Sequence, residues 1–158
     1  MKWDFVRMKL IDNYWMKIAL NQAYKGEKRG EIPIGAVLVK NNYLISSSYN
    51  SCVSLFDSSA HSEILVIRKG GKELKNYRLY NTVLYVTHEP CFMCSAAIIN
   101  SRICRVVYGS YSTKKHDFSY FMNLLYINNI KHHIKDIKSG VLLYECSNLL
   151  KNFFKKKR

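Results

Sequence analysis

Four side chains in this chain have the types and spacing of a hydrolytic metal site. His61, Cys91 and Cys94 can together hold one zinc ion, and Glu63 lies two positions after the histidine. Zinc binds imidazole nitrogen and thiolate sulfur readily, and a catalytic zinc keeps three protein ligands so that water can take the fourth position. A carboxylate that lies beside the metal without binding it can move protons to and from that water. The four residues therefore predict hydrolysis at a zinc ion.

The order of these residues is more specific than their types. His-x-Glu at 61–63 precedes Pro-Cys-x-x-Cys at 90–94, and this order is the signature of zinc-dependent deaminases. A Cys-x-x-Cys pair alone also occurs in structural zinc sites and in redox pairs. A redox pair leaves His61 and Glu63 without a role, and a structural zinc needs four ligands and no separate carboxylate. We therefore predict a deaminase site.

The composition indicates one globular domain with a polyanionic partner. The chain has 158 residues, 48% of them hydrophobic, and a formal net charge of +14, which is a large positive charge for one domain. Nucleic acid is the commonest partner of such a protein, although AT-rich coding DNA also enriches lysine. The basic residues gather at the end of the chain, as Lys151, Lys155, Lys156, Lys157 and Arg158.

The sequence also bears on the cellular compartment. Two of the five cysteines are assigned to the metal, and we expect the other three to be reduced thiols. We find no signal peptide and no apolar run long enough to span a membrane. We therefore expect a cytoplasmic protein that does not enter a membrane.

Helices and strands are predicted to alternate along the chain. Apolar residues three and four apart indicate helices, and short runs rich in β-branched residues indicate strands. This alternation predicts an α/β sandwich around one sheet, in a single domain over 1–158. The predicted helices are 14–28, 61–69, 91–100, 117–127 and a basic C-terminal helix at about 143–158, and the predicted strands are 34–39, 43–49, 83–87 and 105–109, with 141–143 either ending a strand or beginning the last helix.

Local signals set the predicted ends of these elements. Asp12 or Asn13 can cap the first helix, Asn41-Asn42 predicts a hairpin turn, and Gly70-Gly71 predicts the end of the second helix. His61 and Cys91 each begin a predicted helix, where unpaired N–H groups favour thiolate and a developing negative charge. The predicted elements thus bring two helix N-termini to the metal.

Beyond the metal motif, the chain resembles the bacterial tRNA-specific adenosine deaminases from about residue 14 onward. The metal residues do not distinguish this family from other cytidine-deaminase-like proteins, but a basic C-terminal helix is typical of it. The stretches that carry the resemblance are Tyr14-Trp15-Met16, Glu31 to Val39, Asn50, Ala60 to Ile64, Asn76 to Leu79, Thr82 to Thr87, Glu89-Pro90-Cys91, Met93-Cys94, Ser101-Arg102-Ile103 and Glu145-Cys146 to Phe153-Phe154.

The resemblance implies a fold, a reaction and partners. The fold would be a three-layer α/β/α sandwich with a central mixed sheet, as in cytidine deaminase, in a homodimer with one zinc ion per subunit. The reaction would convert adenosine to inosine at the wobble position of a tRNA anticodon stem-loop. By position, Asn50 would hydrogen-bond the purine, Ile32 and Ile34 would line its pocket, and the backbone at Ser62 and Cys91 would orient the amine and the water. We further expect Phe153 and Lys156 to contact the RNA.

Departures from the family pattern leave alternatives open. Ser62 replaces the usual alanine, His88 replaces a leucine, 95–97 lacks a common glycine, and 110–116 lacks the usual Asp and glycines. The alternative enzyme is a deaminase of a free base or nucleoside such as guanine, cytosine or cytidine, which has no need of a basic tail. An alternative of another class is an idle, zinc-stabilised RNA-binding module, which removal of the metal would unfold.

Overall fold

The computed structural model describes residues 2–113 and 117–157. The described residues form a five-stranded sheet in the order β2-β1-β3-β4-β5. β1 pairs antiparallel with β2 and β3, whereas β3, β4 and β5 run parallel, so the sheet is mixed as predicted. The elements are α1 (Lys2–Lys28), β1 (Gly35–Lys40), β2 (Tyr43–Tyr49), α2 (Ser62–Glu73), β3 (Thr82–His88), α3 (Phe92–Asn100), β4 (Arg105–Ser110), α4 (Phe118–Ile127), β5 (Asp136–Lys138) and α5 (Leu143–Lys156).

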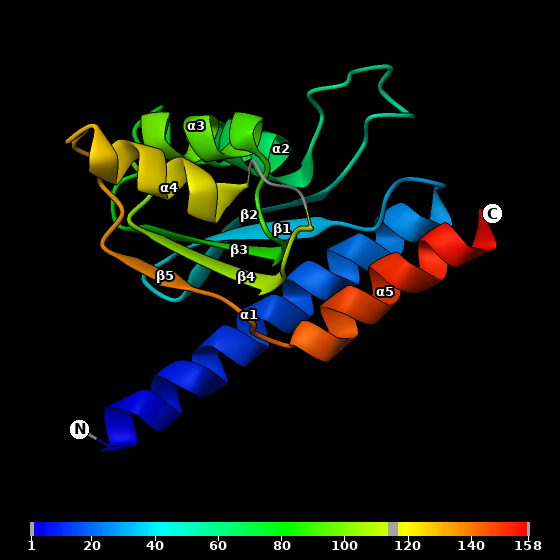
Figure 1. The fold of residues 1–158 in the computed structure, drawn as a ribbon, viewed down its shortest axis with the longest axis horizontal. Coiled ribbons are helices and arrows are strands. Elements are labelled where there is room, and N and C mark those ends of the chain that lie inside the picture. The colour runs from blue at the N-terminus through cyan, green and yellow to red at the C-terminus, as the bar shows by residue number, and fades with distance from the viewer. Residues whose placement is uncertain (1, 114–116, 158) are drawn as a thin grey trace.

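Helices cover both faces of the sheet, which confirms the predicted three-layer sandwich (Figure 1). Alternate residues of β1 supply the two cores, because successive side chains of a strand point to opposite faces. Val37 and Val39 pack with buried residues of α1 and α5. Ala36 and Leu38 pack on the other face with residues of α2, α3 and α4. No helix among the described residues is long and apolar enough to cross a membrane.

The first helix begins earlier than predicted. It starts at Lys2, so Asp12 lies inside the helix and does not cap it. The Asp12 carboxylate instead accepts hydrogen bonds from Tyr85 (3.0 Å) and from the Arg105 guanidinium (2.6 and 2.9 Å). A polar residue that looked like a local cap is therefore a long-range partner of the sheet.

The predicted stop of the second helix is also wrong. Gly70 and Gly71 lie inside α2, which continues to Glu73. A Cβ atom at Gly70 would clash with Leu38 Cδ2, so the glycine allows the helix to pack closely against β1. The Asn41-Asn42 turn is confirmed, since both residues have positive φ (49° and 62°) between β1 and β2. Of residues 141–143, Val141 and Leu142 form a turn with Leu142 as the N-cap, and α5 begins at Leu143. The short strand β5 was not predicted.

Candidate metal centre

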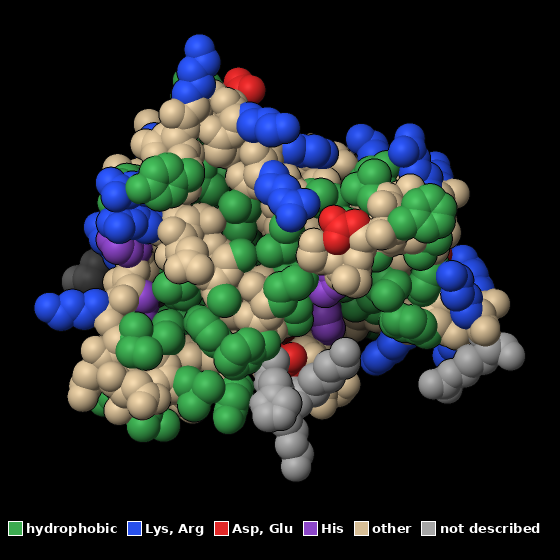
Figure 2. Space-filling view, turned by 90° about the horizontal axis from the view of Figure 1, so that it is seen from above, with side chains coloured by type: hydrophobic (Ala, Val, Ile, Leu, Met, Phe, Trp, Pro, Cys, Tyr) green, Lys and Arg blue, Asp and Glu red, His purple; other side chains and the backbone are tan. Residues whose placement is uncertain are grey.

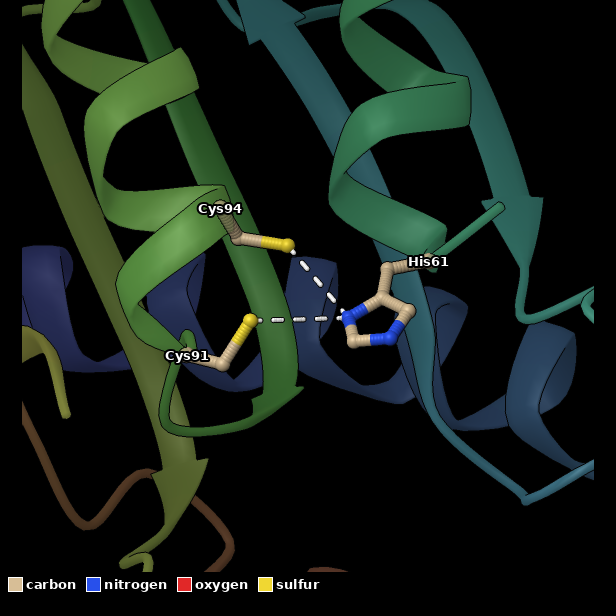
Figure 3. A group of neighbouring side chains, drawn as sticks. All are labelled: His61, Cys91 and Cys94. Carbon is tan, nitrogen blue, oxygen red and sulfur yellow. Dashed lines mark hydrogen bonds between the residues drawn. The ribbon is translucent and has the colours of Figure 1, made fainter. Parts of the chain in front are cut away.

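The three predicted zinc ligands meet where α2 and α3 begin. His61 is the N-cap residue of α2, Cys91 is the N-cap residue of α3, and Cys94 lies one turn further along α3. His61 Nδ1 lies 3.6 Å from Cys91 Sγ and 3.5 Å from Cys94 Sγ (Figure 3). All three ligand atoms lie within 4.8 Å of one another, as ligands of one ion must. The two helix N-termini thus bring residues thirty positions apart into one cluster.

The surroundings shift the pKa values of the two thiols in opposite directions. The hydrogen bond with Cys94 lowers the pKa of Cys91 to about 4, against the opposing effect of burial, and His61 lowers it further. The same hydrogen bond and burial raise the pKa of Cys94 above its ordinary value. Cys91 is therefore the thiol that loses its proton more readily, and thiolate is the form in which cysteine binds zinc.

The donor set fits a catalytic zinc ion. One imidazole nitrogen and two sulfurs supply the three protein ligands of such a site and leave one position for water. His88, which departs from the family pattern, is not part of the cluster. Its Nδ1 lies 2.8 Å from the Ser110 hydroxyl oxygen. The metal residues predicted from the motif are therefore the ones that the fold brings together.

Glu63 lies beside the metal residues in the first turn of α2. Its side chain is only 4% exposed, and its Oε2 accepts a hydrogen bond of 2.8 Å from the Ser62 hydroxyl. Burial raises the pKa of this carboxyl above the ordinary value. A carboxyl group with a raised pKa holds a proton more readily than an exposed one, so it is suited to accept a proton and return it. The serine that departs from the family pattern is thus a direct partner of the carboxylate.

Asn50 holds the start of α2 in place. Its side-chain oxygen accepts a hydrogen bond of 2.8 Å from the Ser62 backbone N–H, and its own N–H donates to the Ile34 carbonyl oxygen. Asn50 is 4% exposed, so this amide is fixed beside the metal residues. Because the side-chain oxygen is engaged by Ser62, the predicted hydrogen bond from Asn50 to a purine would use the side-chain nitrogen.

The two isoleucines predicted to line the base pocket differ in exposure. Ile32 is 41% exposed, whereas Ile34 is half-buried and packs against the core beneath α2, α3 and α4. Ile34 therefore contributes to the packing of the core. Ile32 is the one that presents apolar surface to solvent.

Glu31 fixes the loop 51–59, a function that the sequence pattern did not predict. The carboxylate accepts hydrogen bonds from the backbone N–H groups of Val53 (3.1 Å) and Ser54 (2.7 Å). Burial acts to raise its pKa, but these hydrogen bonds outweigh it and hold the pKa below the ordinary value. The loop bears Phe56, which is 97% exposed and has a positive φ of 50°. The sequence signal that could have indicated this role is the acidic Glu31 itself, two residues before Pro33.

Glu89 fixes the altered segment on the other side of α3. Its Oε1 accepts hydrogen bonds from the Ser119 N–H and hydroxyl, and its Oε2 accepts one from the Ser112 N–H. The loop predicted to be altered therefore has a defined anchor at each end. Its central part, 114–116, lies outside the described residues.

The C-terminal helix places only part of the predicted RNA-contacting set at the surface. Phe153 is 5% exposed and packs inside the protein, so little of its ring is presented to solvent, and its contact with RNA stays a prediction. Phe154, stacked edge-on against it at 5.4 Å, is 47% exposed. Lys156 is exposed, and its Nζ lies 3.3 Å from a Glu27 carboxylate oxygen. The helical period thus turns the second phenylalanine to solvent.

The chain was compared with known protein families and with individual proteins. Residues 10–110 match the model of the cytidine and deoxycytidylate deaminase zinc-binding region. A tRNA-specific adenosine deaminase of Buchnera aphidicola subsp. Schizaphis graminum is 50% identical over 147 residues, which cover 93% of this chain and 96% of that protein.

Two solved structures are informative. One, from a study of A-to-I editing by tRNA A34 deaminases at the wobble position, matches with a TM-score of 0.81 and 38% identity, over 87% of this chain and 99% of that chain. The other is a guanine deaminase from Bacillus subtilis, with a TM-score of 0.61 and 34% identity, over 70% of this chain and 73% of that chain. The former covers more of both chains and superposes more closely.

Proposed function

Because the chain belongs to the family of cytidine and deoxycytidylate deaminases with a zinc-binding region, we infer that it is a zinc-dependent hydrolase that converts adenosine to inosine at the wobble position of a tRNA anticodon. The observation that carries this conclusion is the joint match of fold and sequence. The relative named a tRNA-specific adenosine deaminase shares half of its residues with this chain over nearly the full length of both. The structure of a tRNA A34 deaminase superposes over 87% of the chain.

The geometry allows a role to be derived for each side chain of the pocket. Bound zinc supplies a Lewis acid that brings the pKa of a water molecule toward neutrality. Glu63 lies within the same turn as His61 and accepts the proton that this water loses on attacking C6 of the adenine. Glu63 passes this proton to the ring nitrogen, then takes the second proton of the same water from the hydroxyl added at C6 and gives it to the leaving amine. One water is consumed, and the products are inosine and ammonia.

The substrate base must be unpaired to reach this pocket, because a base inside a duplex is inaccessible. Anticodon loops offer such bases, and single-stranded loops are where RNA is recognised by stacking and edge contacts. We propose that Asn50 donates to the purine from its fixed position and that Ile32 covers the base. Phe154 and Lys156 on α5 are proposed to contact flanking nucleotides. The net charge of +14 supports a polyanionic substrate.

A homodimer is part of the proposal. Figure 2 shows hydrophobic side chains gathered over the layer of α2, α3 and α4. Phe92 and Met93, beside the ligand Cys91, are 44% and 39% exposed, and Tyr126 and Ile127 of α4 are 81% and 71% exposed. An exposed apolar face of this kind marks an interface. We propose that residues 1–158 act as one deaminase domain in such a dimer, in the cytoplasm, where tRNA is available.

The substrate class is tested by offering several substrates to one preparation. A synthetic anticodon stem-loop with adenosine at the wobble position is compared with free adenosine, cytidine and guanine, and Glu63→Ala is the control. We expect inosine in the stem-loop alone, and none with the variant. Conversion of guanine with the stem-loop untouched would instead support a metabolic deaminase, the function suggested by the Bacillus subtilis structure.

A further inference from the structure

A basic and aromatic cluster lies far from the metal centre, and the reaction above does not use it. It consists of Tyr80, Arg102, Lys131, His133 and Lys135, here called the distal patch. Tyr80 follows the C-terminal end of α2, Arg102 follows that of α3, and the other three precede β5. The metal residues lie at the opposite, N-terminal ends of α2 and α3. The separation is about 14 to 18 Å, the lengths of α3 and α2 at about 1.5 Å per residue.

The three segments of the distal patch are tied together by backbone hydrogen bonds. The Leu79 N–H donates to the Ser101 carbonyl oxygen at 2.7 Å, and the Lys135 N–H donates to the Cys104 carbonyl oxygen at 2.7 Å. The patch is therefore a fixed surface built from the ends of several elements. Figure 2 shows Lys, Arg and His side chains gathered at the left edge of the molecule, next to exposed hydrophobic side chains.

Tyr80 is the centre of this surface. The Arg102 guanidinium donates a hydrogen bond of 2.6 Å to the Tyr80 hydroxyl and lies 5.6 Å from the ring centroid. The His133 ring meets the Tyr80 ring edge-on at 5.7 Å. Two neighbours thus hold the tyrosine in one orientation while 38% of its surface stays exposed. A pre-oriented aromatic ring beside a guanidinium group is a stacking surface for a base.

The cations of the distal patch have no acidic partners among the described ion pairs. None of those ion pairs includes Arg102, Lys131 or Lys135. The nearest carboxylate in sequence, Asp136, is engaged by the Arg105 guanidinium at 2.6 Å. Lys131 and Lys135 are exposed on either side of His133. The charge of this surface is therefore available to a polyanion.

We propose that the distal patch is a second RNA-binding surface, which takes an unpaired strand with its phosphates on Arg102, Lys131 and Lys135 and a base on the Tyr80 ring. Phosphate contacts supply affinity that falls with salt, and aromatic stacking supplies affinity for unpaired bases of any sequence. A nucleotide in the metal pocket cannot reach this surface. The strand therefore belongs to another part of the same tRNA or to a second RNA molecule.

The direct test is binding of a fluorescent twelve-residue oligouridine, which contains no base for the pocket to deaminate. Lys131→Ala/Lys135→Ala should weaken binding about tenfold and reduce the salt slope by about 1.4, at about 0.7 for each single-strand phosphate contact. Tyr80→Ala should weaken binding about tenfold through lost stacking. The matched control is Lys9→Ala/Lys17→Ala, which removes the same charge from the exposed side of α1. It should change binding less than twofold.

A second readout locates the contact and separates it from catalysis. Photo-cross-linking of a thiouridine oligomer should label the peptides that carry Tyr80 or His133 in the wild type, and the label should be lost in the patch variants. All variants should deaminate the short stem-loop at the wild-type rate, so a failure of the proposed reaction would appear in the wild type itself. Equal weakening by the α1 control would overturn the proposal, as would an unaffected Tyr80→Ala or labelling confined to α5.

Discussion

Two buried polar clusters lie toward opposite ends of β3 and β4, and they use buried charge differently. In one, the Asp12 carboxylate accepts hydrogen bonds from the Tyr85 hydroxyl and the Arg105 guanidinium. Arg105 also donates a hydrogen bond to Asp136. In the other, the ligand atoms of His61, Cys91 and Cys94 lie within 4.8 Å of one another, next to the buried Glu63. The first cluster is fully paired and holds α1 to the sheet. The second groups three metal-binding side chains beside a carboxyl that can carry a proton, which is what a metal and a substrate require.

The largest effect on activity is expected from a change in the cluster of metal residues. Cys94→Ala removes one of the three ligands, so zinc content should fall well below one per chain and inosine formation should fall to background. The fold should survive, because both cores are independent of the metal. Metal analysis, activity on the stem-loop and the far-ultraviolet circular dichroism spectrum of the same sample check this. Unfolding of the variant would instead favour a zinc-stabilised binding module.

The paired cluster should show the opposite behaviour. Asp12→Ala leaves the Arg105 guanidinium, 14% exposed, without its main partner. The free energy of unfolding should drop by about 3–5 kcal/mol, while activity per folded, zinc-loaded molecule stays unchanged. Asp136→Ala is the matched control, because that carboxylate is 56% exposed and should cost less than about 1 kcal/mol. Urea denaturation measures both, and equal losses would refute the distinction.

A change at Glu31 should have an intermediate effect on the free energy of unfolding, and this effect should depend on pH. Glu31→Gln weakens the two hydrogen bonds that hold the loop 51–59, which should cost about 1.5–3 kcal/mol at pH 7. Because the pKa of Glu31 is below the ordinary value of 4.5 in the folded protein, the wild-type advantage is fully present above that pH. It should shrink as the pH falls below 4.5 and the wild-type carboxylate is protonated. A stability difference that grows toward acid pH would contradict this assignment.

The smallest effect is expected from a residue outside both clusters, at the proposed RNA contact on α5. Lys156→Ala on α5 should raise KM for the stem-loop a few-fold and reduce the salt dependence of binding by about 0.7, leaving kcat unchanged. The lysine is exposed and its partner Glu27 lies 3.3 Å away, so only part of its charge is available to RNA. Steady-state kinetics at two salt concentrations measure both parameters. An unchanged salt dependence would remove Lys156 from the RNA contact.

The sequence predicts the metal cluster well because its geometry is local. Cys91 and Cys94 are one helical turn apart, and His61 begins the neighbouring helix, so two helix N-termini on one sheet bring the ligands together. Most helices and strands were predictable for the same reason. Their hydrophobic pattern is contained in a few consecutive residues, as the continuous buried run of β1 from Gly35 to Val39 illustrates.

The features that sequence reasoning missed depend on distant partners. Asp12 looks like a cap until Tyr85 and Arg105 appear beside it, 73 and 93 positions away. Gly70 looks like a helix end until Leu38 is packed against it. Phe153 and Phe154 are adjacent and identical, and only the packing of α5 decides which ring is buried.

The account depends most directly on Glu63, the buried carboxyl beside the metal residues. Zinc content and inosine formation on the anticodon stem-loop should be measured on one preparation of Glu63→Gln, alongside the wild type. We predict one zinc per chain in both proteins, with inosine formed by the wild type and none above background in the variant. Wild-type inosine formation by the variant would contradict the assignment of Glu63 as the group that moves protons at this site.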